Sequence, residues 1–324
     1  MTAPASHRRR LVWLLRVVGT LAGVAYVAYM VQGQNLGDAA GRVPLLMLAA
    51  AIAAVALNVA VGAVRWRVLL DAYGASQVPP WRRLIYLYFQ SFFYNNCLPG
   101  AVTGDVVRGI ATRQAFGPHG LTGTMAVVLV ERILGLFGLF VLLAVGLVVA
   151  GGVADDPGSL WLWTGIGVAG TLAVVAAVAS ARRLAPRLPG RLGEIAGRLP
   201  AIVRPGAFAA AVALSVVTQV FVALAGWLLL VSLDPGVGFA ASLLVVPLAS
   251  ATTFLPITVG GTGAREAVFI LLCGRLFGMP ESDAVVASLG LWLAHLVVGA
   301  AGGLAQVFER GDTAAQPVAD LDSA

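Results

Sequence analysis

The stretch Leu98-Pro99-Gly100-Ala101-Val102-Thr103-Gly104-Asp105-Val106-Val107-Arg108 interrupts an otherwise apolar region with two helix breakers and two charged residues. A second stretch, Leu255-Pro256-Ile257-Thr258-Val259-Gly260-Gly261-Thr262-Gly263-Ala264-Arg265, aligns with it without a gap, 157 positions later. The identities pair Leu98, Pro99, Val102, Gly104 and Arg108 with Leu255, Pro256, Val259, Gly261 and Arg265. Helix breaks that carry arginine at corresponding positions of two halves are typical of a transporter site at a repeat interface. The alternative is a chance match, because Leu, Val and Gly are abundant in this chain.

The composition indicates an integral membrane protein. Of the 324 residues, 59% are hydrophobic and only 11% are charged, whereas a soluble domain carries about 25% charged residues. All 21 basic residues are arginines, and they cluster in loops between apolar spans. The net charge of +6 therefore marks cytoplasmic loops and not a nucleic-acid partner. Cys97 and Cys273 both lie in apolar surroundings, so no disulfide framework is expected, and no cleavable signal peptide is expected either.

The first two spans follow a short polar tail, residues 1–10, that ends in three arginines and is expected to be cytoplasmic. Leu11–Val31 and Val43–Val64 each have the roughly 20 apolar residues that a bilayer requires. We expect Arg65-Trp66-Arg67 to close the second span and to begin a cytoplasmic, interfacial loop.

The segments Leu84–Leu98 and Gly100–Phe116 are too short or too charged to cross the bilayer comfortably. We interpret them as a re-entrant hairpin that enters from the cytoplasm, breaks at Pro99 and Gly100, and returns. Irregular backbone at that depth is tolerated only where it is buried in protein or lines a wet cavity. The alternative is that these segments cross fully.

The middle of the chain is expected to cross the bilayer three times. Leu121–Gly151 leads to an acidic external loop, Leu160–Ser180 returns, and Ala207–Leu233 crosses outward again. Between the last two lies a basic, leucine-periodic stretch, Ala181–Gly206, which predicts an amphipathic segment on the cytoplasmic leaflet.

A second hairpin, Phe239–Leu255 and Ala264–Phe277, breaks at Pro256 and is expected to open to the outside. Ala284–Phe308 is the last span, and the polar tail 309–324 is expected to be cytoplasmic like the first. The sequence thus predicts an all-α, polytopic transmembrane helical bundle within one domain, residues 11–308. Six spans and two broken, re-entrant hairpins form an inverted repeat with halves of about 43–151 and 207–308.

Arg108 and Arg265 require compensation, because an arginine embedded in a membrane costs about 2.5 to 3.5 kcal/mol on insertion scales. Asp105 precedes Arg108 by three positions, so both lie on one helix face. In Glu131-Arg132 and in Arg265-Glu266 the two adjacent side chains point about 100° apart on a helix. We therefore expect each of these charges to pair with a residue of another segment. The expected pairs are Glu131 with Arg108 or Arg265, and Arg132 with Asp105 or Glu266. The functional interpretation is a phosphate-binding cavity; the structural interpretation is an ion-pair network that locks the hairpins together.

Other candidates keep two interpretations each. The glycines near the helix breaks either expose backbone N–H groups to an anion or permit tight packing; they are Gly100, Gly104, Gly260, Gly261 and Gly263. Asn95 and Asn96 either contact a headgroup or cap the broken helix, and capping is favoured. His295 either relays protons or packs, and packing is favoured. We expect no metal and no cofactor, because no metal-ligand or nucleotide motif occurs.

Three motifs in order resemble a flippase-like membrane family, typified by the lysylphosphatidylglycerol synthase transmembrane region. They are Phe93-Tyr94-Asn95-Asn96 through Asp105-Val106-Val107-Arg108, then Val130-Glu131-Arg132, then Leu255-Pro256 through Arg265-Glu266. The resemblance covers nearly the whole chain and implies lipid translocation between leaflets. In bifunctional members a soluble transferase domain makes the lipid; we expect this protein to lack that domain, because only a short acidic tail follows the last span. Thr103 departs from a Gly that is frequent in the family.

These observations predict a plasma-membrane protein that moves an anionic phospholipid or lipid-linked headgroup between leaflets. Its expected partners are membrane lipids and a separate lipid-modifying enzyme. It is not expected to be an enzyme, although a membrane-embedded transferase and a non-transporting scaffold remain the alternatives. The expected substrate-binding residues are Asn95, Asn96, Gly104, Asp105, Arg108, Glu131, Arg132, Gly260, Gly261, Gly263, Arg265 and Glu266.

Overall fold

The structure is a computed structural model that describes residues 35–97, 102–149, 157–187, 201–254 and 263–314, with a few isolated residues elsewhere. Its long helices are α3 (Leu45–Ala72), α4 (Trp81–Cys97), α6 (Gly120–Val149), α7 (Pro157–Leu184), α9 (Pro205–Leu233) and α12 (Glu281–Ala314). The shorter helices are α2 (Leu36–Gly41), α5 (Thr103–Ala111), α10 (Phe239–Ala251) and α11 (Ala264–Phe277), with 3-10 turns η1 (Arg113–His119), η2 (Ala185–Arg187) and η3 (Thr252–Phe254). The described residues contain no strand, and the predicted all-α fold is confirmed.

Among the described residues, four helices are long and apolar enough to cross a membrane. They are α3, α6, α9 and the first 24 residues of α12. The predicted span Leu160–Ser180 lies within α7, which has 28 residues. Large apolar side chains such as Leu46 and Leu162 are exposed, as expected of surfaces that face lipid. The chain is therefore a multi-pass membrane protein; its predicted first span, Leu11–Val31, lies largely outside the described residues.

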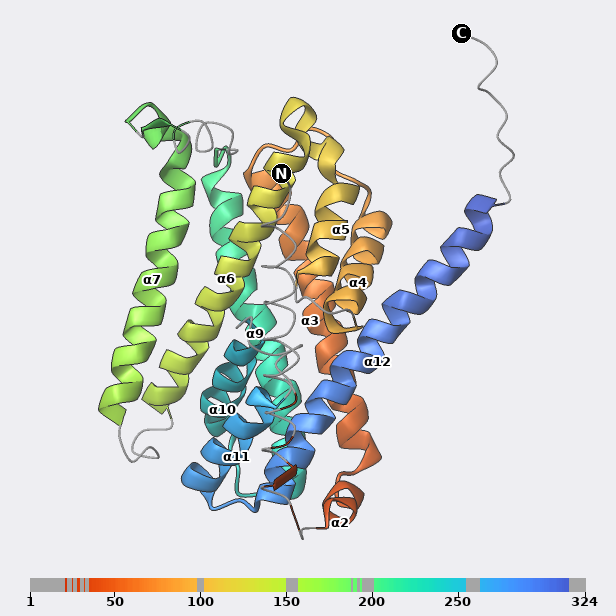
Figure 1. Ribbon diagram of the computed structural model, residues 1–324, viewed down its shortest axis with the longest axis vertical. Coiled ribbons are helices and arrows are strands. Elements are labelled where there is room, and N and C mark those ends of the chain that lie inside the picture. Colours follow the sequence, from red (N-terminus) through yellow and green to blue (C-terminus); the bar gives the residue numbers. More distant parts are fainter. Residues whose placement is uncertain are drawn as a thin grey trace, which may run out of the picture.

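The α4–α5 hairpin begins and ends at one end of the bundle (Figure 1). The backbone N–H of Ser76, before α4, donates to the carbonyl oxygen of Ala115, after α5, at 2.9 Å. The N–H of Val203, before α9, donates to the carbonyl oxygen of Ala72 at 2.8 Å. We call this end, formed by residues 73–80, η1 and 201–204, the basic end. The hairpin returns to the end from which it starts, and α5, with nine residues, is much shorter than the roughly 20 residues that a membrane span requires. This length favours a re-entrant hairpin, which stays a prediction.

The α10–α11 hairpin lies in the opposite half of the bundle (Figure 1). At that far end Arg42, before α3, forms an ion pair with Asp283 of α12. The indole N–H of Trp227 also donates to the carbonyl oxygen of Val237, in the connection between α9 and α10, at 3.0 Å. Two hairpins from opposite ends are the arrangement that an inverted repeat requires; the repeat symmetry itself stays a prediction.

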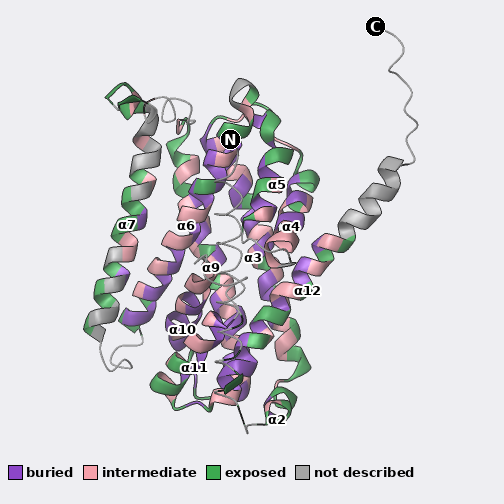
Figure 2. Cartoon of the chain, viewed as in Figure 1, coloured by how far each residue is buried: buried purple, intermediate pink, exposed green. Residues whose placement is uncertain are grey.

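The core forms where the helices face one another, and buried residues concentrate on these inner faces (Figure 2). One part of this core contradicts the prediction that Arg65-Trp66-Arg67 closes the second span. Arg65 and Trp66 do not lie in an interfacial loop, because α3 continues without a break to Ala72. Trp66 is fully buried and Arg65 is 8% exposed. Arg65 was predicted to end the span because it is charged. No Pro or Gly follows it within α3, and Leu69 and Leu70 of the next turn are completely buried.

Several predictions fall on residues that the structure does not describe. The helix breakers Pro99, Gly100 and Pro256 lie outside the described residues, as do Gly260 and Gly261. The predicted amphipathic stretch Ala181–Gly206 is described only at its two ends and at a few isolated positions.

The hairpin arrangement predicts labelling from opposite sides of the membrane. Gln114 of η1 and Gly238, before α10, are both exposed, at the basic and far ends respectively. In a background carrying Cys97→Ala and Cys273→Ala, we expect Gln114→Cys and Gly238→Cys to react with a membrane-impermeant maleimide from opposite faces. Labelling of both from the same face, in sealed vesicles of known orientation, would contradict the fold.

A candidate anion-binding site

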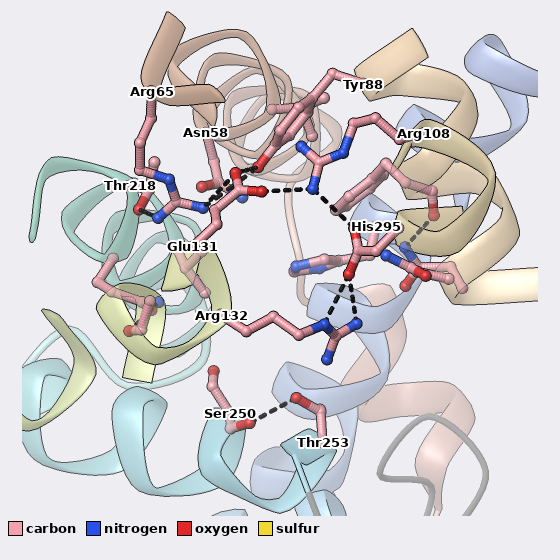
Figure 3. Close-up of a pocket in the computed structure, with 18 of the residues that line it drawn as sticks. Asn58, Arg65, Tyr88, Arg108, Glu131, Arg132, Thr218, Ser250, Thr253 and His295 are labelled. Carbon is pink, nitrogen blue, oxygen red and sulfur yellow. Dashed lines mark hydrogen bonds and ion pairs between the residues drawn. The ribbon is translucent and has the colours of Figure 1, made fainter. Parts of the chain in front are cut away.

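A cavity of about 290 Å³ lies inside the bundle, and residues of both hairpins line it (Figure 3). Seven residues predicted for the site line the cavity: Asn95, Asn96, Asp105, Arg108, Glu131, Arg132 and Arg265. Residues that the sequence analysis did not place in the site complete the lining, and they include Asn58, Arg65, Tyr88, Thr218 and Gln219. The structure therefore brings the arginines of the two matching stretches to one cavity.

Arg108 is the most deeply buried of these charges, with 2% of its surface exposed. Its Nη2 donates to Asp105 Oδ1 at 3.0 Å, as the three-residue spacing predicted. The same nitrogen forms an ion pair with Glu131 of α6, which confirms one of the predicted pairs across segments. The guanidinium carbon lies 4.2 Å from the ring centre of Trp66 and 4.5 Å from that of Tyr88. These aromatic faces add favourable cation–π contacts where little water reaches.

Five charges of alternating sign form a chain through the lining: Arg65, Glu131, Arg108, Asp105 and Arg132. Glu131 accepts from Arg65 Nη2 at 3.1 Å through Oε1 and pairs with Arg108 through Oε2. Asp105 Oδ2 accepts from Arg132 Nη2 at 2.6 Å, the second predicted pair. Because each carboxylate lies between two arginines, both ends of the chain are positive.

Arg65 is the main residue that the sequence analysis missed. Besides Glu131, it donates from Nη1 to Ser215 Oγ at 3.2 Å and Thr218 Oγ1 at 3.3 Å, both on α9. A signal was present: Asn58 precedes Arg65 by seven residues, which is about two helical turns, so both lie on one face of α3. Reading this region as one helix places both polar residues on the inner face.

The second hairpin pairs its charges differently from the prediction. Arg265 Nη2 lies 2.5 Å from Glu266 Oε1, and Ser288 of α12 donates to the same oxygen at 3.1 Å. Adjacent residues were expected not to pair, but the long arginine side chain bends back to its neighbour. Glu266 Oε2 also accepts the backbone N–H of Gly263 at 2.6 Å, at the start of α11. Glu266 and Gly263 therefore support Arg265 from outside the cavity lining.

The polar residues beside the first helix break act mainly in capping and packing. Asn95 Oδ1 accepts the backbone N–H of Gly104 at 2.9 Å and so caps the start of α5, as favoured. Asn96 donates to the carbonyl oxygen of Phe92 at 2.8 Å. Gly104 does not line the cavity; a Cβ there would lie 1.9 Å from the carbonyl oxygen of Ser91. Gly104 thus permits close contact between α4 and α5, and it offers no free N–H to an anion.

His295 packs within the cavity wall. Its Nδ1 lies 2.8 Å from the carbonyl oxygen of Leu291, and its ring stacks on Phe92 with 5.7 Å between ring centres. These contacts account for the histidine without a proton relay.

The cavity lining carries four arginines against two carboxylates; with Glu266, which pairs with Arg265 just outside the lining, an excess of one positive charge remains. Guanidinium groups are planar forks that suit phosphate and carboxylate oxygens. Charges inside a membrane protein are costly and usually mark a substrate or ion pathway. The arrangement is therefore suited to binding an anionic group inside the bundle.

The fold and this cavity define a polytopic α-helical membrane protein with an internal, arginine-rich site. The chain belongs to the family of the lysylphosphatidylglycerol synthase TM region, whose model matches residues 13–303. It is thus a membrane protein of a lipid-related family. A search of curated proteins found no match.

Proposed function

We propose that this protein translocates a lipid with an anionic, phosphate-bearing headgroup between the two leaflets of the plasma membrane. One observation carries the proposal: arginines from two hairpins of opposite orientation line one cavity within a membrane bundle. A lipid headgroup that crosses the hydrocarbon layer must exchange its hydration shell for polar partners. The four arginines supply those partners at depth, while the acyl or polyprenyl tails remain in lipid.

The hairpins suit alternating access to the cavity. The α4–α5 hairpin lies in the half of the bundle toward the basic end and the α10–α11 hairpin in the half toward the far end (Figure 1), and residues of both line the cavity. Among the described residues no ion pair joins one hairpin to the other. Each hairpin contributes one arginine of the two matching stretches, Arg108 or Arg265, to the shared cavity, as transporters that move one repeat against the other around a common site do.

Translocation needs no covalent chemistry, and we propose that this protein is not an enzyme. Both carboxylates that line the cavity are already engaged in ion pairs with arginines. The lipid would be supplied by a separate lipid-modifying enzyme. Transport would be passive or coupled to an ion gradient.

The charge distribution supports an orientation with the basic end, and both termini, in the cytoplasm. Exposed arginines gather at that end: Arg82, Arg83, Arg113, Arg183, Arg187 and Arg204. The far end carries Asp38, Asp234, Glu281 and Asp283 beside Arg42 and Arg275. Cytoplasmic loops of membrane proteins are enriched in arginine and lysine.

A leaflet-translocation assay on alanine variants of two α11 arginines, Arg265 and Arg275, tests the proposal. Purified protein is placed in liposomes that carry fluorescent anionic or zwitterionic lipid, and an external quencher reports the leaflet of each. We expect wild type to translocate the anionic lipid. Arg265→Ala should lower the rate about tenfold or more, as expected for losing one charge-assisted contact. Arg275→Ala is the matched control, because Arg275 is exposed and lies outside the cavity.

Equal rates for Arg265→Ala and wild type, in protein confirmed to be folded, would exclude the second hairpin from the site. The absence of translocation for every lipid by folded wild type would count against the proposed function itself.

A further inference from the structure

Glu131 occupies the point in the cavity where positive charge converges. Its Oε1 accepts from Arg65 Nη2 at 3.1 Å and from the hydroxyl of Tyr88 at 3.0 Å. Its Oε2 pairs with Arg108 Nη2. One carboxylate thus bridges arginines of α3 and α5, and it is 3% exposed. An anionic ligand that binds both arginines must take this position from Glu131.

Glu131 nevertheless satisfies these arginines poorly. It contacts each of them through one nitrogen only, and Arg108 Nη2 is shared with Asp105. Among the described residues, Arg108 Nε and Nη1 and Arg65 Nε are buried without a hydrogen-bond partner. An arginine fork is satisfied best by two parallel hydrogen bonds to one acceptor group. The side chains are therefore arranged around an acceptor with more oxygens than a carboxylate has.

We propose that Glu131 is an internal competitor of the lipid: its carboxylate holds Arg65 and Arg108 when the cavity is empty, and the phosphate group of the lipid displaces it. This inference rests on the proposed function and names how the site exchanges its ligand. A phosphodiester offers two non-bridging oxygens, which share one negative charge, and two ester oxygens, so it can contact both forks at once. A simple carboxylate only repeats what Glu131 already provides. The site therefore selects phosphate over carboxylate.

Tyr88 sets how firmly the competitor is held. Its hydroxyl accepts from Arg65 Nη2 at 3.3 Å and donates to Glu131 Oε1. Removing the hydroxyl deletes one hydrogen bond to Glu131 and one from Arg65, and it leaves every charge in place. The ring that lies against Arg108 also remains. Tyr88→Phe should therefore weaken the hold on Glu131 while both arginines keep their charge and Arg65 keeps its ion pair with Glu131.

The test measures the affinity of detergent-purified protein for dimethyl phosphate, a soluble phosphodiester, with acetate as the carboxylate probe. We expect Glu131→Gln to bind dimethyl phosphate about tenfold more tightly than wild type. This factor corresponds to a wild type in which Glu131 holds the arginines in about nine of ten molecules, a hold that the variant lacks. Tyr88→Phe should give a smaller gain. Asp283→Asn is the control: this carboxylate is 2% exposed and pairs with Arg42, away from the cavity.

A gain of affinity separates this role from a structural one, since a merely destabilised protein does not bind an anion more tightly. Unchanged or weaker binding by folded Glu131→Gln would overturn the inference, and so would an equal gain in Asp283→Asn or for acetate. If Glu131→Gln does not fold, Tyr88→Phe decides by the same criteria. If Glu131→Gln binds dimethyl phosphate more tightly but wild type translocates no lipid, the proposed function is wrong and the competition between Glu131 and the anion stands. Translocation by wild type with no gain would remove the competition alone.

Discussion

Arg108→Ala is expected to lower lipid translocation by at least about 30-fold, the largest functional effect in the molecule. Truncating one partner of a buried, hydrogen-bonded charge pair costs about 2 kcal/mol or more, which corresponds to that factor. Arg108 is the centre of the charge chain, so its loss leaves Asp105 and Glu131 without their shared partner. The measurement is the liposome assay with anionic lipid.

Arg108→Lys separates charge from geometry. Lysine keeps the positive charge but has no planar fork, so it cannot reproduce two parallel hydrogen bonds. We expect an intermediate rate, between wild type and Arg108→Ala. Unimpaired translocation by Arg108→Ala, in protein of normal abundance and thermal stability, would remove Arg108 from the site.

Gly104→Ala is expected to give the largest loss of stability among single methyl additions in the α4–α5 hairpin. The new Cβ would lie 1.9 Å from the carbonyl oxygen of Ser91, a backbone atom that moves only with α4. Relieving such an overlap by backbone shifts costs about 1 to 3 kcal/mol. The movement would also disturb the Asn95 cap, which the Gly104 N–H makes. Thermal unfolding in detergent should show a clearly lowered midpoint.

Gly109→Ala is the matched control on the same helix. Its Cβ would lie 1.8 Å from Met125 Cε, almost the same overlap as at Gly104. The obstructing atom is here the end of a flexible side chain, and methionine readily adopts another rotamer. Alanine also stabilises a helix by about 1 kcal/mol over glycine. We expect an unchanged or slightly raised midpoint; equal losses in both variants would refute the close-packing role of Gly104.

The membrane class and the position of the hairpins follow from local sequence. Apolar runs of bilayer length predict membrane spans directly, and a helix breaker followed by charged residues indicates a segment that cannot face lipid. The pairs Asp105–Arg108, Glu131–Arg108 and Arg132–Asp105 were also predictable. A buried charge must find an opposite partner, and few candidates exist in so apolar a chain. The same reasoning did not foresee the pair of Arg265 with its own neighbour, because side-chain length and bending are not visible in spacing.

The sequence by itself determined that this is an all-α, multi-pass membrane protein with charges at two helix breaks. Only the tertiary structure decided which polar groups meet. Arg65 and Tyr88 enter the cavity because α3 continues past Val64 and α4 lies against it, whereas Glu266 remains outside the lining. Helix existence depends on local composition, but the rotation and packing of each helix depend on contacts between segments far apart in the chain. The cavity arises from those contacts, and so does the place of Glu131 between two arginines.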